Sequence, residues 1–181
     1  MLEIIAVIFT LVSVWLTRKQ NIWCWATGIV GTICYYFIFK HDQSWGNMLL
    51  QFVFFAQSIY GWINWGKADS DEIEHSDGMY ILMEGLFALL IFTLVYFATT
   101  IMEFPLSVLD ISTTALSILG MYLIATKKLE AWYFWALADV LYIIFFLTTG
   151  HILSAILYVI FLINAYFGYK EWKNSIKVPT Y

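Results

Sequence analysis

Seven long apolar segments constrain the fold of this chain more than any other feature of its sequence. They cover residues 1–17, 22–39, 45–65, 79–98, 105–126, 131–149 and 152–170. Each is close to the roughly 20 residues that an α-helix needs to cross a hydrocarbon core. Only 12% of the residues are charged, against about 25% in an average soluble domain. The sequence therefore predicts an all-α membrane protein with seven transmembrane helices.

The basic residues predict how these helices are oriented. With seven helices, one side of the membrane receives Arg18, Lys19, Lys67, Lys127, Lys128, Lys170, Lys173 and Lys177, and the other side receives only Lys40. Because Lys and Arg are enriched in cytoplasmic loops, the first side is expected to face the cytoplasm. We therefore predict that the N-terminus lies outside and the C-terminus in the cytoplasm.

The chain contains an internal repeat, with identical residues 109 positions apart in its first part and 107 positions apart further on. The pairs are Ala6 with Ala115, Thr17 with Thr126, Lys19 with Lys128, Trp23 with Trp132, Phe37 with Phe146, Leu50 with Leu157, Phe54 with Phe161, Gly61 with Gly168 and Trp65 with Trp172. Since one segment separates the halves, both have the same orientation, as in some secondary transporters. We predict three-helix repeats over 1–67 and 105–174, an acidic loop and linker helix over 68–104, and a tail over 175–181.

Asp139 is the most unusual polar residue, because it lies near the middle of the apolar segment 131–149. A charge at that depth costs roughly 2.5 to 3.5 kcal/mol on insertion scales, and such residues are usually functional. With the 109-residue shift, Asp139 aligns with Val30 and Trp135 aligns with Ala26, so both residues break the repeat. We interpret Asp139 as the floor of a substrate site.

Aromatic residues accompany Asp139 on one face of its helix. Trp132, Trp135, Asp139 and Tyr142 occur at i, i+3, i+7 and i+10, which places them on one stripe. Such a stripe suits a flat organic cation, because aromatic faces attract cations and a carboxylate supplies charge and acceptor oxygens. For Trp132, membership of the interfacial aromatic belt is an equally good interpretation.

Further polar residues at mid-depth are predicted to complete the site. They are Gln51, Gln57 and Ser58 in the third segment, with Tyr158 and Asn164 in the seventh. Gln57 and Asn164 occupy equivalent positions in the repeat, so a hydrogen bond between packed helices is the alternative for both.

Other functional classes find little support in the sequence. An enzyme needs a catalytic set, but Asp139 is the only carboxylate at the midplane and no histidine accompanies it. His41, His75 and His151 lie in loops or at helix ends without ligand spacing, so we expect no metal site and no cofactor. The acidic loop over 69–77 is expected to be a solvated linker. A structural accessory subunit is the alternative to a transporter, and it predicts that Asp139 pairs with protein.

Several motifs resemble the Pnu family of bacterial vitamin transporters. They are the pattern Trp132-x-x-Trp135-x-x-x-Asp139, the run Leu49-Leu-Gln51 followed by Ile59-Tyr-Gly-Trp62, and the arrangement of three, one and three helices. The resemblance covers nearly the whole chain. It implies a SWEET-like architecture in the bacterial cytoplasmic (inner) membrane and facilitated diffusion, with trapping of the vitamin by cytoplasmic phosphorylation.

The resemblance also bears on the vitamin, which is nicotinamide riboside, thiamine or riboflavin in this family. Nicotinamide riboside carriers typically have asparagine at the last position of the motif, so Asp139 resembles the thiamine branch. The amino group of thiamine donates hydrogen bonds, for which a carboxylate is a better acceptor than an amide. We expect thiamine, with nicotinamide riboside as the alternative and a non-transporting accessory subunit as a further one. The expected partners are this vitamin and the lipid bilayer, without nucleic acid, and a homo-oligomer is left open.

Overall fold

The computed structural model describes the backbone of residues 1–41, 45–67, 72–76, 78–101, 103, 108–148 and 150–176. Its helices are α1 (Leu2–Arg18), α2 (Trp23–His41), α3 (Trp45–Trp65), α4 (Gly78–Ile101), α5 (Val108–Ala125), α6 (Ala131–Thr148) and α7 (Ile152–Ser175). The predicted all-α fold with seven helices is confirmed for this part of the chain. Parts of the predicted acidic loop (68–71 and 77) and tail (177–181) lie outside the described residues.

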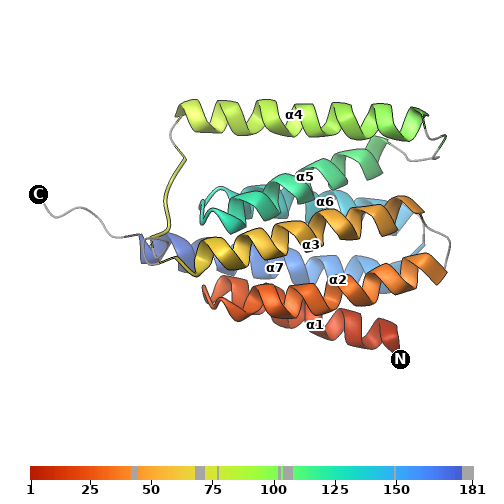
Figure 1. The fold of residues 1–181 in the computed structure, drawn as a ribbon, viewed down its shortest axis with the longest axis horizontal. Helices are drawn as coiled ribbons and strands as arrows, with labels where there is room; N and C mark the ends of the chain where they lie inside the picture. Colours follow the sequence, from red (N-terminus) through yellow and green to blue (C-terminus); the bar gives the residue numbers. More distant parts are fainter. Residues whose placement is uncertain are drawn as a thin grey trace, which may run out of the picture.

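Six of the helices form a closed ring. Each of α1, α2 and α3 packs on the next, α3 packs on α5, α5 on α6 and α6 on α7, and α7 returns to α1. The fourth helix lies outside the ring, where it packs on α5 (Figure 1). The first repeat therefore consists of α1–α3 and the second of α5–α7. They meet at two seams, one between α3 and α5 and one between α1 and α7.

The two repeats are related by a shift of 107 residues throughout. The turn after α1 contains Gln20 with φ of 54°, and the turn after α5 contains Lys127 with φ of 53°. Equivalent hydrogen bonds follow, since Asn21 donates to the Leu16 carbonyl and Lys128 donates to the Leu123 carbonyl. The 109-residue shift that the sequence suggested for the first two helices is therefore wrong.

The correction changes which residues are equivalent. Trp132 corresponds to Trp25 and not to Trp23, and the nearness of these two tryptophans in sequence explains the error. Asp139 corresponds to Thr32, and Trp135 corresponds to Gly28. Both pairs still break the repeat, so the asymmetry that singled out Asp139 and Trp135 remains.

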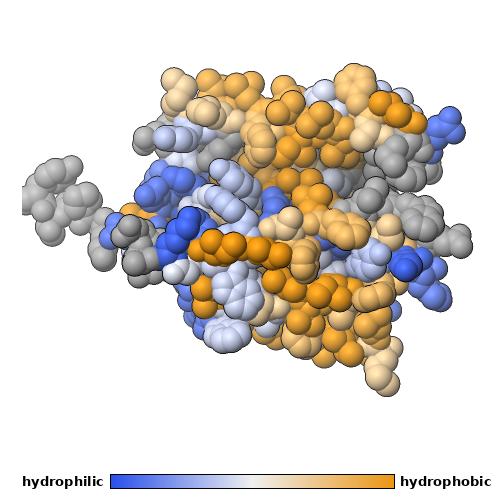
Figure 2. Space-filling model, viewed as in Figure 1, coloured by the Kyte–Doolittle hydropathy of each residue, from blue (hydrophilic) through white to orange (hydrophobic). Residues whose placement is uncertain are grey.

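The outer surface of the bundle is suited to lipid. Large apolar side chains are exposed on several helices, for example Ile4 (64%), Leu82 (59%) and Ile163 (52%). Figure 2 shows a wide hydrophobic area on one face of the molecule, with hydrophilic residues more frequent toward the two ends of the helices. By length and hydropathy together, α6 is the one helix among the described residues that qualifies as a span, with a mean hydropathy of 1.7.

Part of the acidic loop packs against the second repeat. The Glu74 amide donates to the Lys127 carbonyl at 3.2 Å, and the Leu129 amide donates to the Glu74 carbonyl at 3.0 Å. The Lys128 ammonium lies 2.7 Å from a Glu74 carboxylate oxygen, and Ile73 is buried. These residues therefore do not form the solvated linker that the sequence predicted. They hold the start of α4 close to the turn between α5 and α6.

Candidate substrate-binding site

Asp139 is buried in the middle of α6. It is the ninth of the 18 residues of this helix, and its exposure is only 3%. None of the ion pairs among the described residues includes it. A carboxylate at this depth normally has a compensating partner. The described part of the chain supplies no cation, so a positively charged ligand is a suitable one.

Aromatic residues lie on the side of Asp139 that faces the C-terminal end of α6. The rings of Tyr142 in α6 and Tyr158 in α7 stack with centroids 4.4 Å apart, and Phe146 stacks on Tyr158 at 5.4 Å. Tyr158 lies within electrostatic range of Asp139, Tyr142 and Tyr35. Because Tyr35 belongs to α2, residues of both repeats lie near Tyr158.

Tyr35 is a candidate site residue that the sequence analysis missed. With a shift of 107 residues it corresponds to Tyr142, and both rings stack on a phenylalanine four residues later, Phe39 and Phe146 respectively. The signal was present in the sequence. It was hidden because the 109-residue shift aligned Tyr142 with an isoleucine instead.

Trp135 lies one turn before Asp139 and packs against α5. A Cβ atom at Gly120 would lie 3.0 Å from the Trp135 indole nitrogen, so only glycine leaves the ring its full space. The first repeat has the opposite arrangement, with Gly28 beside the Ser13 hydroxyl. The second repeat therefore has the large Trp135 opposite Gly120, whereas the first repeat has Gly28 opposite Ser13. Only the second repeat has space for a tryptophan at this position.

Trp132 lies in a different environment from the other residues of the predicted stripe. It is buried, with 4% exposure, and its ring meets Trp172 edge-on at 5.3 Å. The backbone of Gly168 lies directly against its ring. It belongs to an aromatic core near the start of α6 and does not lie in an interfacial belt, so direct contact with a ligand stays a prediction.

The polar residues of α3 and α7 divide into two groups. Gln51 and Ser58 are buried, and their side chains donate to the carbonyls of the preceding turn, at 3.3 and 2.8 Å. Gln57 instead donates to the Ile118 carbonyl of α5 at 2.8 Å, as expected of a residue that joins packed helices. Asn164 corresponds to Gln57, and its buried amide nitrogen lacks a partner within the described structure.

The repeat also indicates where Gln51 lies. It corresponds to Tyr158 with the 107-residue shift. Tyr158 lies within electrostatic range of Tyr35 of the other repeat. Since Gln51 and Tyr142 are the equivalents of these two residues, we expect Gln51 to face Tyr142. Among the described residues, no group of three His, Cys, Asp or Glu side chains could hold a metal ion.

Comparison with known proteins identifies the family. A family model described as nicotinamide mononucleotide transporter matches residues 1–174. The chain belongs to this family. The nicotinamide riboside transporters PnuC of Escherichia coli (strain K12) and Shigella flexneri are each 23% identical to it, over 97% of this chain and 86% of theirs. The resemblance to the Pnu family is thereby confirmed.

A solved structure supports the same fold. The crystal structure of the vitamin B3 transporter PnuC matches with a TM-score of 0.82 and 18% identity, over 97% of this chain and 81% of that one. The protein therefore has the fold of a Pnu transporter, and it is a multi-pass protein of the inner membrane. The relatives that the chain matches are transporters.

Proposed function

We propose that the protein is a facilitated-diffusion carrier for a cationic vitamin, and that nicotinamide riboside is its substrate. Asp139 carries this proposal, because it is a buried carboxylate without a cationic partner in the described structure. The ring of nicotinamide riboside has a permanent positive charge, which the carboxylate would compensate. The expectation of thiamine gains no support from the comparisons, whereas two relatives are named as nicotinamide riboside transporters.

The surrounding residues fit the remaining parts of such a ligand. Tyr142, Tyr158 and Trp135 provide aromatic faces near the carboxylate, and each favourable contact between a cation and an aromatic ring contributes about 0.5 to 2 kcal/mol. Gln51 and Ser58 are buried polar groups of the other repeat. They are suited to hydrogen bonds with the hydroxyl groups of a ribose.

Thiamine is the second candidate, and Asp139 is again the observation that favours it. The carboxylate replaces the asparagine expected in nicotinamide riboside carriers, and it is the better acceptor for the amino group of thiamine. An accessory subunit without a ligand is less well supported. It requires a protein partner for Asp139, which the described ion pairs do not supply.

The orientation in the membrane is part of the same proposal. Seven of the eight Lys and Arg residues in the described part of the chain lie on the side where α1, α3, α5 and α7 end. We place this end in the cytoplasm by the positive-inside rule. The substrate would then leave toward a cytoplasmic kinase, which traps it as a phosphorylated form that Asp139 repels by like charge.

A binding assay on purified protein tests this proposal, with nicotinamide riboside, thiamine and riboflavin measured side by side. We expect nicotinamide riboside to bind most tightly. Asp139→Asn should weaken binding by about 1.5 to 3 kcal/mol, the range for hydrogen bonds to charged groups, which is roughly 10- to 150-fold. Preference for neutral riboflavin, or unchanged affinity in a folded Asp139→Asn variant, would refute the role of charge. Tighter binding of thiamine would establish the second candidate.

A further inference from the structure

Four buried tryptophans form a continuous cluster at the basic end of the ring, which we call the tryptophan tetrad. They are Trp25 at the start of α2, Trp65 at the end of α3, Trp132 at the start of α6 and Trp172 near the end of α7. Their exposures are 4%, 6%, 4% and 0%. Tryptophan near a membrane surface usually lies at the interface with its N–H group in water. Complete burial of four of them therefore indicates a specific task.

The tetrad has the symmetry of the repeat. Trp25 meets Trp65 edge-on at 5.4 Å and 87°, and Trp132 meets Trp172 edge-on at 5.3 Å and 87°. The two pairs join at the centre, where the rings of Trp65 and Trp172 are 6.1 Å apart. Because Trp65 and Trp172 are equivalent residues, their contact lies on the axis that relates the repeats. This is where a path between the repeats would pass.

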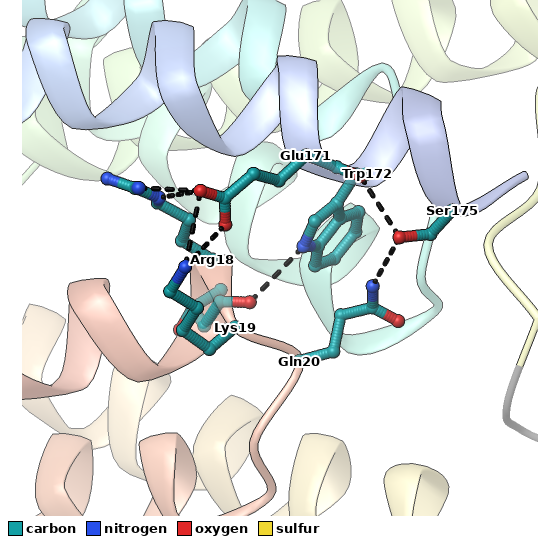
Figure 3. Close-up of polar contacts among 7 residues, drawn as sticks. Arg18, Lys19, Gln20, Glu171, Trp172 and Ser175 are labelled. Atoms are coloured by element: carbon teal, nitrogen blue, oxygen red, sulfur yellow. Dashed lines mark hydrogen bonds and ion pairs between the residues drawn. The ribbon is translucent and has the colours of Figure 1, made fainter.

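Trp65 and Trp172, at the centre of the tetrad, each donate a hydrogen bond across a seam between the repeats. The Trp65 indole nitrogen donates to the Ile124 carbonyl of α5 at 3.1 Å. The Trp172 indole nitrogen donates to the Thr17 carbonyl of α1 at 3.2 Å (Figure 3). Thr17 and Ile124 are equivalent residues. The two bonds therefore tie the last helix of each repeat to the first helix of the other.

The outer pair of the tetrad differs in its hydrogen bonding. The indole nitrogens of Trp25 and Trp132 are buried and have no partner in the described structure. A buried donor without an acceptor destabilises the state in which it occurs. Any arrangement that exposes these two groups to water removes this cost. The hydrogen bonds from Trp65 and Trp172 thus stabilise the closed tetrad. The unpartnered N–H groups of Trp25 and Trp132 destabilise it and so favour opening.

We propose that the tryptophan tetrad is the inner gate of the transport path, and that Trp65 and Trp172 separate when the protein opens to the cytoplasm. This rests on the proposed function as a carrier. Trp132 lies seven residues before Asp139 on the same helix, about 10 Å closer to the basic end. A ligand at Asp139 must pass this level to reach the cytoplasm, and the closed tetrad blocks it.

The native Cys24 provides a probe of opening. It is 1% exposed and belongs to the same buried cluster as Trp25 and Trp65. In a Cys34→Ala background, Cys24 is the only thiol in the sequence. The experiment measures its labelling by a membrane-impermeant maleimide added to the cytoplasmic face of inside-out vesicles.

Phenylalanine substitutions distinguish a gate from a merely structural core, since they keep an aromatic ring and remove the N–H group. Trp65→Phe and Trp172→Phe should each raise the labelling rate by about 2- to 10-fold, the effect of losing one neutral hydrogen bond. Trp25→Phe removes an unpartnered donor from the closed state, so it should leave labelling equal or slower. Trp23→Ala, at an exposed tryptophan outside the tetrad, should have no effect.

The outcomes test the gate independently of the proposed substrate. If all three phenylalanine variants accelerate labelling alike, or none does, the tetrad is a packing core and the proposal is wrong. Vitamin binding by the purified variants, expected within about twofold of wild type, shows that they are folded, with gel-filtration profiles as a second check. Because labelling needs no vitamin, failure of the wild type to bind any vitamin would refute the proposed function alone.

Discussion

At the scale of single residues, the two repeats differ most where the candidate site lies. Asp139 corresponds to Thr32, and Trp135 corresponds to Gly28. An acidic and an aromatic side chain thus occur in the second repeat only, and Gly120 of α5 accommodates the larger one. Since the same backbone fold exists in the first repeat without these side chains, folding does not require them. We therefore propose that they serve ligand binding.

Gly120→Ala should lower vitamin affinity several-fold without removing any side chain that binds. The new Cβ atom would lie 3.0 Å from the Trp135 indole nitrogen and displace the ring beside Asp139. Overpacking costs about 1 to 3 kcal/mol, and alanine restores about 1 kcal/mol of helix propensity, so the variant should lose at most about 2 kcal/mol of stability. Isothermal titration with the purified protein measures the affinity.

Gly85→Ala in α4 is the matched control, because nothing lies within 4 Å of its Cβ position. It should leave vitamin affinity unchanged. Equal affinity of wild type and Gly120→Ala would show that Trp135 does not contact the ligand.

At the scale of helices, the two seams between the repeats are held by different interactions. Side chains of α3 donate to carbonyls of α5 at three positions, from Gln57, Asn64 and Trp65. The seam between α1 and α7 has one such bond, from Trp172 to the Thr17 carbonyl, and otherwise an ion-pair cluster in which Arg18 and Lys19 contact Glu171 (Figure 3). The Asn164 amide, equivalent to that of Gln57, has an unpartnered nitrogen. The seam between α1 and α7 is therefore the better suited to open.

Glu171→Gln should accelerate opening at the basic end, because it weakens the contact of α7 with α1. The ion pair is partly exposed, with side-chain exposures of 22% for Arg18 and 33% for Glu171, so its contribution is small, about 0.2 to 1 kcal/mol. We expect Cys24 labelling to become up to about fivefold faster. High salt screens the ion pair, so it should raise the labelling rate of the wild type toward that of the variant and leave the rate of the variant unchanged.

The pH dependence of this effect follows from the ion pair. The hydrogen bond from Arg18 lowers the pKa of the Glu171 carboxyl group, which lies beyond the predicted span. Because this pKa is lowered, the ion pair stabilises the closed state fully at any pH above the ordinary pKa of a glutamate. This stabilisation is lost as the pH falls through the lowered pKa of Glu171. The labelling rates of wild type and Glu171→Gln should both rise with pH as the reactive thiolate of Cys24 forms, but their ratio should be constant between about pH 6 and 8. A change of this ratio within that window would contradict the assignment to Glu171.

At the scale of the whole molecule, nothing in the sequence suggests a source of energy for active transport. The sequence has no P-loop and no pair of intramembrane acids around Asp139. Two similar repeats related by an axis along the membrane normal suit an exchange between inward-open and outward-open states. Such a carrier only equalises the free vitamin across the membrane, and accumulation then depends on phosphorylation.

Liposomes containing the purified protein should take up labelled nicotinamide riboside only until the inside and outside concentrations are equal. Trapped kinase with ATP should raise this plateau, because the phosphorylated product no longer binds. Collapse of a proton gradient should leave the initial rate unchanged. Accumulation in liposomes without kinase would exclude passive transport.

The sequence by itself determined the seven helices, their proposed orientation and the position of Asp139 at mid-depth. These features depend on local properties, since an apolar segment of sufficient length inserts as a helix whatever its neighbours are, and basic turns favour the cytoplasm. The repeat was also visible, although its register in the first two helices was wrong. Trp23 and Trp25 lie too close together for sequence matching to choose between them.

Only the tertiary structure decided which residues lie together. It brought Tyr35 to the group around Asp139, assigned Gln57 to the seam, and buried Trp132 in the tryptophan tetrad instead of at the interface. All three results depend on contacts between helices that are more than 20 residues apart in sequence. Helical periodicity fixes the face on which a side chain lies, but the neighbour of that face is set by packing of the whole ring.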